Sequence, residues 1–413
     1  MIFMKAIVLA AGKATRMKGK PKPILKVGGV EMIKRTVNLL KSYVDEFIFV
    51  VHMKEVEDFV KKLDVRKKII RNEYPEKGNG YSFLLALNHV DGEFILTMAD
   101  HVYSKEFVEK AVKLKGLVVD RNPKYVDVKE ATKVKVENGN LVDCGKNLTE
   151  FDGVDTGFFI LSKKDVSLTD STSEELSLCE VMKSSRIPVS YLDGLFWMDV
   201  DTEEELKVAN KLIVKESVKK TGDGFVSRHF NRKVSTWVSS KLVNRIEPMT
   251  ATILSFFVGV LSALIAFFDP LIGGVVYQIS SILDGIDGEI ARASMKQSEF
   301  GGYIDSIFDR VVDFLFILAI ATVSREFFWG MLAAFTTTMV SYSTEKYKAE
   351  FKRSPFEEIK ILNKIPGKRD ERIFATMIFC LFGFLKELLI FLTLLSIFRV
   401  AATIYLVKRS ESP

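Results

Sequence analysis

Four aspartates form two closely spaced pairs in an apolar part of the chain. Asp284 and Asp287 lie three residues apart, and Asp305 and Asp309 lie four apart. Residues at these spacings project from one face of a helix, so each pair would present two carboxylates together. Carboxylate oxygens are the ligands that Mg²⁺ prefers, and acidic side chains within an apolar segment mark a functional site. The spacing therefore predicts a divalent-metal site for phosphoryl chemistry, in which one carboxylate accepts the proton of an attacking hydroxyl.

The residues between and around these aspartates follow the pattern D-x2-D-G-x2-A-R-x8-G-x3-D-x3-D. This pattern resembles the signature of the CDP-alcohol phosphotransferase (phosphatidyltransferase) family, and the resemblance covers roughly residues 245–407. It implies an integral membrane enzyme with six transmembrane helices, in which an acceptor hydroxyl attacks a CDP-alcohol and CMP leaves. It also implies two bound Mg²⁺ or Mn²⁺ ions, with Asp309 as the general base. The implied metal ligands are Asp284, Asp287, Asp305 and Asp309, and the residues implied to shape the nucleotide pocket are Gly288, Ala291, Arg292 and Gly301.

A proton or ion pathway is the alternative interpretation of aspartates in an apolar segment. Such a pathway would spread carboxylates through the depth of the bilayer. These four instead cluster near the expected cytoplasmic ends of two adjacent helices, which favours an enzyme. Asp313, one turn beyond Asp309, is expected to serve helix packing or to be solvated.

A second group of residues suited to phosphate chemistry lies near the N-terminus. An apolar strand is expected to run into Gly12-Lys13-Ala14-Thr15-Arg16, a glycine turn whose backbone N–H groups could approach phosphates. Arg16 and Lys22 could neutralise the phosphate charge. Asp100 and Asp199 are expected at strand ends, the edge of a parallel sheet at which ligands bind.

Residues 4–213 resemble the nucleotide-sugar pyrophosphorylase-like nucleotidyltransferase superfamily. The resemblance implies that a sugar or polyol phosphate attacks the α-phosphorus of a nucleoside triphosphate and releases pyrophosphate. Ala14 stands where the family loop G-x-G-x-R has its second glycine, so a degenerate domain that only binds or docks is the alternative. The implied catalytic residues are Arg16 and Lys22, the ligands for one or two Mg²⁺ ions Asp100 and Asp199, the nucleotide-binding residues Gly12 and Gly80, and the acceptor-binding residue Lys146.

Strands and helices alternate in the N-terminal half, which favours a parallel sheet with crossover helices. The expected fold class is an N-terminal α/β nucleotidyltransferase, Rossmann-like with a mostly parallel sheet, followed by an all-α bundle of six transmembrane helices. Strands are predicted at residues 7–11, 46–51, 68–71, 93–98 and 156–162, and helices at 31–41, 55–63, 81–88 and 201–216.

Six apolar segments follow Pro248, most of them near the ~20 residues that span a bilayer. Lysine and arginine are dense at 207–245 and 346–372, so the positive-inside rule puts the soluble domain and both termini in the cytoplasm. Residues 225–242 are predicted to lie as an amphipathic helix on the inner surface of the cytoplasmic membrane, with a solvated basic helix as the alternative. The six segments cover residues 250–268, 270–291, 302–323, 327–345, 373–386 and 388–407, of which the fifth is the weakest.

The composition agrees with this division into a soluble half and a membrane half. A chain of 413 residues is too long for one core. Its 27% charged and 48% hydrophobic residues favour one soluble half and one membrane half. The three widely spaced cysteines predict neither a disulfide framework nor a zinc cluster, and they suit a reducing compartment. A net charge of +6 is too modest to indicate a nucleic-acid partner. The expected boundaries are 1–215 for the nucleotidyltransferase-like domain, 216–248 for a linker with the juxtamembrane helix, and 249–413 for the membrane domain.

The two predicted activities follow one another, because a cytidylyltransferase makes the CDP-alcohol that a CDP-alcohol phosphotransferase consumes. CTP is then the expected nucleotide, and the fusion resembles the family of bifunctional enzymes that join inositol-1-phosphate cytidylyltransferase to di-myo-inositol-phosphate-phosphate synthase. That resemblance implies transfer of phosphoinositol from CDP-inositol to a second inositol-1-phosphate. Lys368 and Arg372 are candidates to bind this acceptor, although both also fit a positive-inside flank. A lipid alcohol acceptor is the alternative, and small residues in the membrane helices would allow a homodimer.

Overall fold

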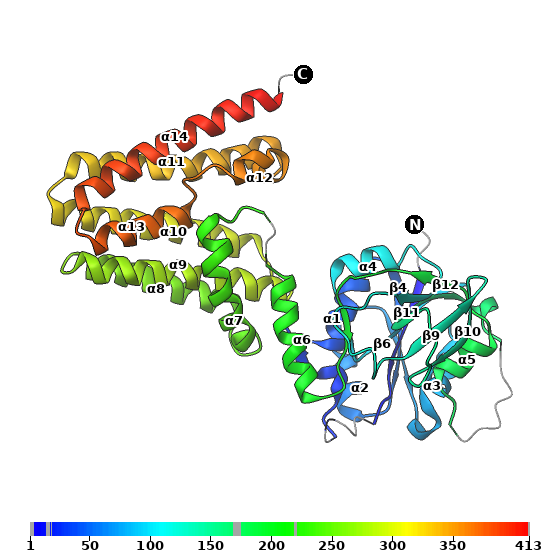
Figure 1. The fold of residues 1–413 in the computed structure, drawn as a ribbon. Coiled ribbons are helices and arrows are strands. Elements are labelled where there is room, and N and C mark those ends of the chain that lie inside the picture. The colour runs from blue at the N-terminus through cyan, green and yellow to red at the C-terminus, as the bar shows by residue number, and fades with distance from the viewer. Residues whose placement is uncertain (1–3, 14–16, 18, 168–174, 219–220, 412–413) are drawn as a thin grey trace. The chain divides into compact units, whose positions relative to one another are not determined.

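The computed structural model describes residues 4–13, 17, 19–167, 175–218 and 221–411. The chain divides into two compact units, unit 1 at Met1–Glu216 and unit 2 at Ser217–Pro413. Figure 1 shows that unit 1 combines a sheet with flanking helices, whereas unit 2 consists of helices. Each unit is built around its own apolar core.

Nine strands form one sheet in unit 1. They are β1 (Met4–Ala10), β4 (Val44–Val51), β5 (Lys67–Arg71), β6 (Glu93–Met98), β8 (Gly116–Asp120), β9 (Lys133–Glu137), β10 (Asn140–Gly145), β11 (Gly153–Ser162) and β12 (Val189–Tyr191). Their order is β10-β9-β11-β6-β1-β4-β5, with β8 paired to β11 and β12 to β8. Strands β6, β1, β4 and β5 pair in parallel, and β11, β9 and β10 extend the sheet by antiparallel pairing. The expected α/β architecture with a parallel centre is confirmed.

The parallel centre follows from continuous apolar runs in the sequence. Strand β1 pairs with β4 on one side and β6 on the other, and residues 6–10 of β1 are all buried. A strand covered on both faces reads as an uninterrupted apolar run, which is why it could be recognised from the sequence. The helices of unit 1 are α1 (Met32–Leu40), α2 (Lys54–Lys61), α3 (Gly78–Leu87), α4 (Lys105–Ala111), α5 (Leu178–Ser184) and α6 (Glu203–Glu216).

Two short antiparallel ribbons and three short 3-10 helices complete the described part of unit 1. The ribbon that matters for the site pairs β7 (His101–Tyr103) with β13 (Trp197–Asp199). The other pairs β2 (Lys26–Val27) with β3 (Val30–Glu31). The 3-10 helices are η2 (Lys22–Ile24), η3 (Pro75–Lys77) and η4 (Lys163–Asp165).

One prediction about the cysteines needs correction. A disulfide joins Cys144 of β10 to Cys179 of α5, with the Cα atoms 5.9 Å apart. The two cysteines are 35 residues apart in sequence, and only the packing of α5 against β10 brings them together. Cys380 is buried and free. Sequence spacing alone therefore could not reveal this pair.

Unit 2 begins with a short helical segment and continues as a helical bundle (Figure 1). Its elements are the π-helix η5 (Ser227–Asn231), α7 (Arg232–Leu242), α8 (Pro248–Ala266), α9 (Pro270–Ala293), α10 (Glu299–Ser324), α11 (Phe327–Phe351), α12 (Pro355–Glu358), the 3-10 helix η6 (Lys360–Asn363), α13 (Arg369–Leu381) and α14 (Leu385–Glu411). A helix lies at each of the six expected apolar segments. Two helices, Pro248–Ala266 and Leu385–Ser410, are long and apolar enough by length and composition to cross a membrane.

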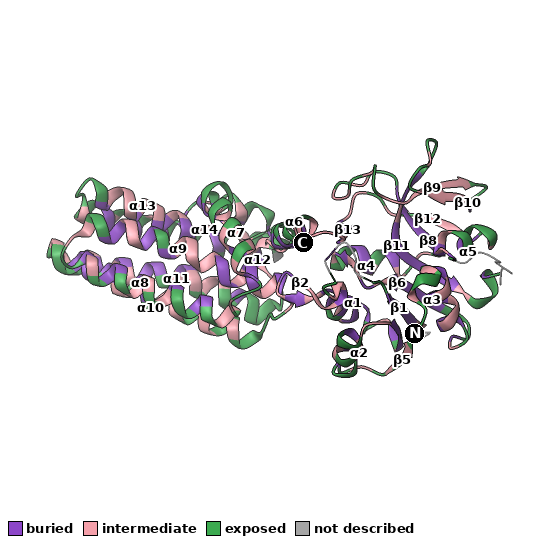
Figure 2. Cartoon of the chain, turned by 90° about the horizontal axis from the view of Figure 1, so that it is seen from below, coloured by how far each residue is buried: buried purple, intermediate pink, exposed green. Residues whose placement is uncertain are grey.

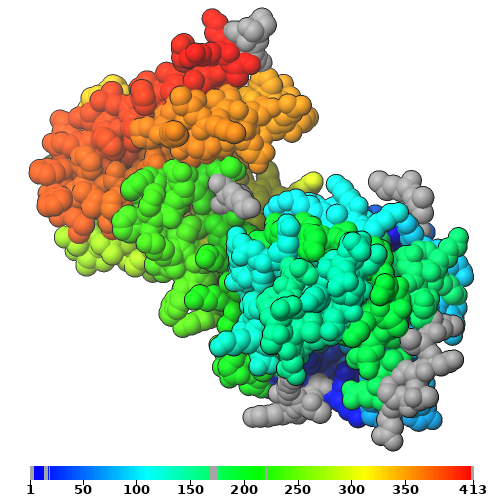
Figure 3. All heavy atoms as spheres, turned by 45° about the vertical axis from the view of Figure 1, so that its right-hand side comes forward, coloured from blue at the N-terminus to red at the C-terminus, as the bar shows by residue number. Residues whose placement is uncertain are grey.

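The outer faces of the unit 2 helices carry large apolar side chains. Figure 2 shows buried stripes on the helix sides that meet neighbours and exposed stripes on the outer sides. In Figure 3 the surface formed by α11 to α14 is coloured orange to red. Apolar patches of this extent on a folded unit indicate contact with lipid or another apolar partner. Exposed examples are Phe328, Met331 and Phe335 on α11 and Leu394, Ile397, Phe398 and Ile404 on α14.

A buried glutamate attaches α7 to the bundle. Glu289 of α9 is 0% exposed, and its carboxylate accepts hydrogen bonds from Ser235 at 2.7 Å and Ser239 at 2.7 Å. Arg232 donates to the same carboxylate at 2.9 Å and pairs with Asp223 at 2.8 Å. The polar face of α7 thus packs against α9, while Trp237 on α7 is 58% exposed. A buried carboxylate with three donors holds the helix in one position.

We expect Glu289→Ala to lower the stability of unit 2 by about 3 kcal/mol, because it leaves two buried serines without their acceptor and removes one of the two carboxylate partners of Arg232. Thermal unfolding of the full chain in detergent measures this loss. Glu299→Ala, at an exposed position on the neighbouring helix α10, is the matched control and should leave the transition unchanged. Equal melting of the two variants would contradict the anchoring role of Glu289.

Candidate functional sites

Unit 1 contains a cavity of about 410 Å³ at the carboxyl ends of β1 and β6. Because the carboxyl ends of parallel strands meet at one sheet edge, segments distant in sequence contribute to it. Four of the predicted site residues line this cavity, namely Gly12, Asp100, Lys146 and Asp199. Asn79 and Ser82 of α3 lie on the same wall. Lys146, which the sequence alone could not separate from a surface lysine, therefore belongs to the cavity wall.

The β7–β13 ribbon brings Asp100 and Asp199 together. Asp199 is the register partner of His101, and the backbone N–H of Val200 donates to the carbonyl of Asp100 at 3.0 Å. The ring nitrogen Nδ1 of His101 lies 2.9 Å from a carboxylate oxygen of Asp100. Two segments about one hundred residues apart thus deliver two carboxylates to one edge of the cavity.

Lys22 supplies the positive charge beside these carboxylates. Its ammonium lies 3.4 Å from Asp100 and 2.6 Å from Asp201. Burial alone would lower the pKa of Lys22, but the charges of Asp100 and Asp201 raise it above its usual value. Burial alone would raise the pKa of Asp100, but the hydrogen bond and charge of His101 and the charge of Lys22 hold it below its usual value. Both groups are therefore charged at neutral pH.

Asp155 is a further carboxylate in this cavity that the sequence did not single out. It accepts a hydrogen bond from the backbone N–H of Gly157 at 2.7 Å. Burial, with the nearby charge of Asp199, raises the pKa of Asp155 to about 6. Burial also raises the pKa of Asp199 above its usual value. Burial thus disfavours the ionised forms of both carboxylates, and a cation bound beside them would stabilise those forms.

The remaining predicted residues of unit 1 do not line the cavity or lie outside the described residues. Gly80 is buried in α3, where a Cβ atom would meet the carbonyl oxygen of Ser177 at 2.6 Å. Among the described residues it is absent from the cavity lining, so packing against the 176–177 segment accounts for this glycine. Arg16 and Ala14 lie outside the residues that the structure describes.

We expect Asp155→Asn to stabilise unit 1 at neutral pH but hardly at pH 4. The pKa of Asp155 in the folded chain, about 6, exceeds the ordinary value of 3.8, so the folded state loses stability as pH rises through this window. The free energy of unfolding gained by Asp155→Asn at neutral pH, relative to pH 4, amounts to at most about 3 kcal/mol. Hydrogen exchange of β11 amides in the full chain without divalent metal, compared between variant and wild type at each pH, measures it. The exposed Asp64→Asn is the control, and a benefit independent of pH would refute the assignment.

Unit 2 gathers three of the four predicted aspartates. One carboxylate oxygen each of Asp284, Asp305 and Asp309 lies within 4.8 Å of the other two. Asp287 is turned towards α8, where its carboxylate accepts a hydrogen bond from the hydroxyl of Thr252 at 2.5 Å. Asp287 is therefore not one of the three clustered carboxylates, although its partner Thr252 lines a cavity together with Asp284, Asp305 and Asp309.

Two arginines supply counter-charge to this cluster, namely Arg369 of α13 and Arg310 of α10, whose guanidinium lies 3.5 Å from Asp309. The Nη1 atom of Arg369 lies 2.7 Å from Asp309 and 3.2 Å from Asp284. Its Nε atom donates to Asp313 at 3.0 Å, and the hydroxyl of Tyr277 donates to the same Asp313 at 2.6 Å. Asp313 thus serves helix packing, one of the two roles expected for it.

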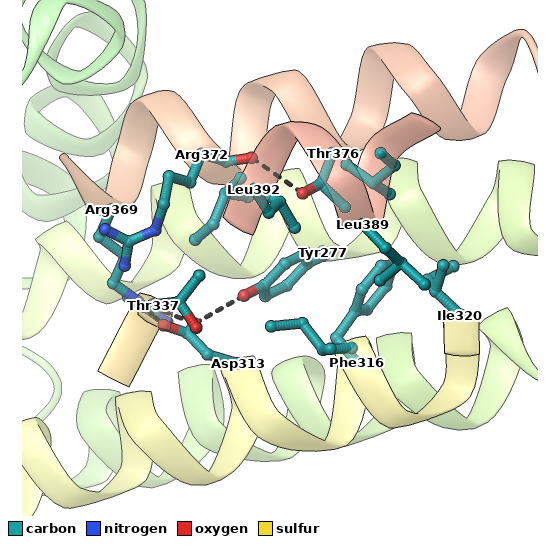
Figure 4. Close-up of a pocket in the computed structure, with 13 residues that line it drawn as sticks. Tyr277, Asp313, Phe316, Ile320, Thr337, Arg369, Arg372, Thr376, Leu389 and Leu392 are labelled. Atoms are coloured by element: carbon teal, nitrogen blue, oxygen red, sulfur yellow. Dashed lines mark hydrogen bonds and ion pairs between the residues drawn. The ribbon is translucent and has the colours of Figure 1, made fainter. Parts of the chain in front are cut away.

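Three cavities in the described part of unit 2 adjoin Arg369, and one of them is lined by Asp284, Asp305 and Asp309 together. A cavity of about 220 Å³ is lined by residues of η5, α7, α9, α10 and α13, among them Asp284, Asp309, Lys368 and Arg369. A narrower chamber lies among α9, α10, α11, α13 and α14 (Figure 4). Arg372 lines that chamber and donates to the carbonyl of Gly367 at 2.8 Å. The two predicted acceptor residues therefore face different spaces, and only Lys368 shares a cavity with the aspartates.

The predicted nucleotide-pocket residues lie on α9 and at the start of α10. A Cβ atom at Gly288 would come within 3.0 Å of the guanidinium of Arg292, one turn further along. Arg292 Nε donates to the carbonyl of Ser217. Gly301 lies in the first turn of α10, where its N–H donates to the hydroxyl of the N-cap residue Ser298 at 3.0 Å. Ala291 is half-buried on the same helix as Gly288.

Comparison with known proteins matches both units. The model of the CDP-alcohol phosphatidyltransferase family matches residues 246–407, and that of the MobA-like NTP transferase domain matches residues 6–115. A protein named bifunctional IPC transferase and DIPP synthase from Archaeoglobus fulgidus is 50% identical, over 99% of this chain and 86% of the relative. The chain belongs to this bifunctional family. It is therefore a transferase with a nucleotidyltransferase domain and a CDP-alcohol phosphotransferase domain.

Two further similarities concern the separate halves. The archaetidylinositol phosphate synthase of Pyrococcus horikoshii is 33% identical over 34% of this chain and 72% of its own length. The solved structure of the inositol-1-phosphate CTP transferase from T. maritima is 26% identical, covers 53% of this chain and 99% of that chain, and has a TM-score of 0.46.

Sequence reasoning missed His101, Asp155 and Arg369. His101 directly follows Asp100, so its position after a strand was a signal that could have been used. Asp155 lies beside a glycine with positive φ, Gly157, in an apolar strand, which is an unusual place for a carboxylate. Arg369 carried no signal of its own, because it is one of many cations between residues 346 and 372.

Proposed function

We propose that unit 1 makes CDP-inositol from CTP and inositol-1-phosphate, and that unit 2 transfers phosphoinositol to a second inositol-1-phosphate with release of CMP. One observation carries this proposal. A single chain holds both a sheet-edge cavity with Asp100 and Asp199 and a three-carboxylate cluster built by two helices. The product of the first site is the substrate of the second. The relatives named IPC transferase and DIPP synthase support the assignment.

In unit 1, Asp100 and Asp199 would hold a divalent cation such as Mg²⁺, and carboxylate oxygens are suited to it. The bound ion would neutralise charge on the triphosphate. Lys22 lies beside the same carboxylate edge and would stabilise the negative charge that develops as pyrophosphate leaves. Lys146 would hold the phosphate of the polyol substrate against the cavity wall. Arg16 and Gly12 would contact the triphosphate.

In unit 2, Asp284, Asp305 and Asp309 fit a divalent cation, because these three carboxylates and the neighbouring Asp313 share only two arginines, Arg310 and Arg369. A bound ion would polarise the pyrophosphate linkage of the CDP-alcohol. Asp309 would accept the proton of the attacking hydroxyl, and Arg369 fixes the orientation of its carboxylate. Asp287 would be a further ligand, and the site would then hold a second ion. The CMP leaving group would lie along Gly288, Ala291, Arg292 and Gly301.

The cavity beside Asp309 favours a water-soluble, phosphorylated acceptor. Lys368 and Arg369 line it, and both are cationic groups suited to phosphate. A lipid alcohol would place an apolar chain where the lining also contains Asp223, Asn231 and Asp370. Arg372 would act from the adjoining chamber, by holding the segment that carries Lys368 through Gly367.

We propose that all six long helices of unit 2 cross the cytoplasmic membrane, with both termini and unit 1 in the cytoplasm. The apolar outer faces of α11 and α14 and the dense positive charge at 346–372 support this topology. Helix α13 has 13 residues, about 20 Å at ~1.5 Å per residue, so it would span the bilayer only together with its flanking segments. A homodimer through unit 2 remains part of the proposal.

We expect Asp199→Asn to abolish pyrophosphate release from CTP and inositol-1-phosphate, while CMP release from added CDP-inositol persists. Asp309→Asn should instead lower the rate of CMP release by at least about 10²-fold, because the attacking hydroxyl loses its base, and should leave pyrophosphate release unchanged. Pyrophosphate and CMP assays on the full chain in detergent measure both, and each variant is the control for the other. A chelator should stop both reactions. If wild type releases no pyrophosphate with any polyol phosphate, unit 1 is a degenerate domain.

We expect CMP release from CDP-inositol to be stimulated by inositol-1-phosphate and not by lipid alcohols, because the acceptor cavity is polar and cationic. Product analysis with each acceptor, in proteoliposomes, measures the preference. Stimulation by a lipid alcohol alone would instead assign unit 2 to phospholipid synthesis.

A further inference from the structure

A buried amide pair joins η5 to α9 beside the acceptor cavity. The amide of Gln278 donates to the side-chain oxygen of Asn231 at 3.0 Å. Asn231 is 3% exposed and Gln278 is 8% exposed. The Nδ2 atom of Asn231 and the Oε1 atom of Gln278 have no hydrogen-bond partner among the described residues. Buried polar atoms are almost always paired, so these two require an explanation.

The opposite assignment of the two amide groups also leaves polar atoms without hydrogen-bond partners. If both side chains are rotated by 180°, the bond between them is preserved in the opposite sense. Asn231 then keeps a free acceptor oxygen in place of a free donor nitrogen. In either orientation one polar atom of Asn231 lacks a partner among the residues that the structure describes.

Asn231 and Gln278 differ in their relation to the acceptor cavity. Asn231 lines the 220 Å³ cavity together with Asp284, Asp309 and Lys368, whereas Gln278 is absent from the described lining. Asn231 is the last residue of the π-helix η5, and the backbone of α7 continues directly from it. Single π-turns are rare within helices and recur at functional sites, where the extra residue per turn redirects a side chain. This turn places Asn231 in the lining of the cavity that contains the proposed general base.

The chemistry of the free atom fits a hydroxyl group. A hydroxyl can donate or accept, so it satisfies Asn231 in either orientation, whereas a phosphate oxygen only accepts. The cations Lys368 and Arg369 already suit the phosphate of the acceptor. We propose that Asn231 determines acceptor specificity by hydrogen-bonding one ring hydroxyl of the polyol. This inference rests on the proposed function of unit 2.

Kinetics of the full chain with CDP-inositol and inositol-1-phosphate test the role of Asn231. Asn231→Leu should raise KM for inositol-1-phosphate about three- to tenfold and leave KM for CDP-inositol within twofold. Asn231→Ser, which keeps a hydroxyl able to donate and accept, should recover part of the loss and provides a second variant if Asn231→Leu does not fold. Pyrophosphate release by unit 1 should be unchanged in both.

Gln278→Leu is the matched control, since it removes the same hydrogen bond and Gln278 is not among the described residues that line the cavity. It should leave KM for the acceptor within twofold. If KM for the acceptor rises equally in Gln278→Leu and Asn231→Leu, Asn231 has only a structural role. If only KM for CDP-inositol rises, Asn231 contacts the donor substrate instead. Either result overturns the inference, as does an unchanged KM.

Acceptor analogues that lack one hydroxyl give an independent readout. Wild type should discriminate against one deoxy analogue by the same three- to tenfold factor, and Asn231→Leu should not discriminate against that analogue. Uniform discrimination by both proteins would refute the contact. If wild type releases no CMP with inositol-1-phosphate at all, the proposed function fails, a result distinct from a functional wild type whose variant keeps its KM.

Discussion

The main constraint on unit 2 is electrostatic. Three carboxylates lie within 4.8 Å of one another in an apolar bundle, and their mutual repulsion must be offset. Such an arrangement persists only if positive charge is brought to it. Arg369 supplies part of that charge from α13, and its other contact, with Asp313, ties the site to Tyr277 and the bundle core. The position of α13 is therefore coupled to the site, and with it the placement of Lys368 at the cavity wall.

Unit 1 meets a similar constraint by different means. Asp100, Asp155 and Asp199 share a cavity with His101, and Lys22 bridges from Asp100 to Asp201. The strands supply a rigid edge, and the short β7–β13 ribbon closes it by bringing the second carboxylate from residue 199 to residue 100. In both units, acidic side chains from separate segments of the chain lie close together. A basic side chain pairs with them, Lys22 in unit 1 and Arg369 in unit 2, and offsets part of their repulsion.

Several parts of this arrangement could be predicted because they depend on local patterns. The apolar run of β1 identified a central strand, and the i, i+3 and i, i+4 spacings identified which aspartates share a helix face. The disulfide between Cys144 and Cys179 could not be predicted, because it depends on α5 packing against β10. The same holds for the orientation of Asp287, which follows a hydroxyl on α8, and for the packing role of Gly80.

The sequence by itself determined the two-part organisation, the residue types that carry the chemistry and the family, because periodicity and motif spacing are properties of contiguous residues. Tertiary structure alone decided which of those residues meet. Arg369 reaches Asp284 and Asp309 across 60 or more positions, and Arg372, three residues later, faces a separate chamber. Such distances depend on how helices pack against one another, and packing is set by side chains far apart along the chain.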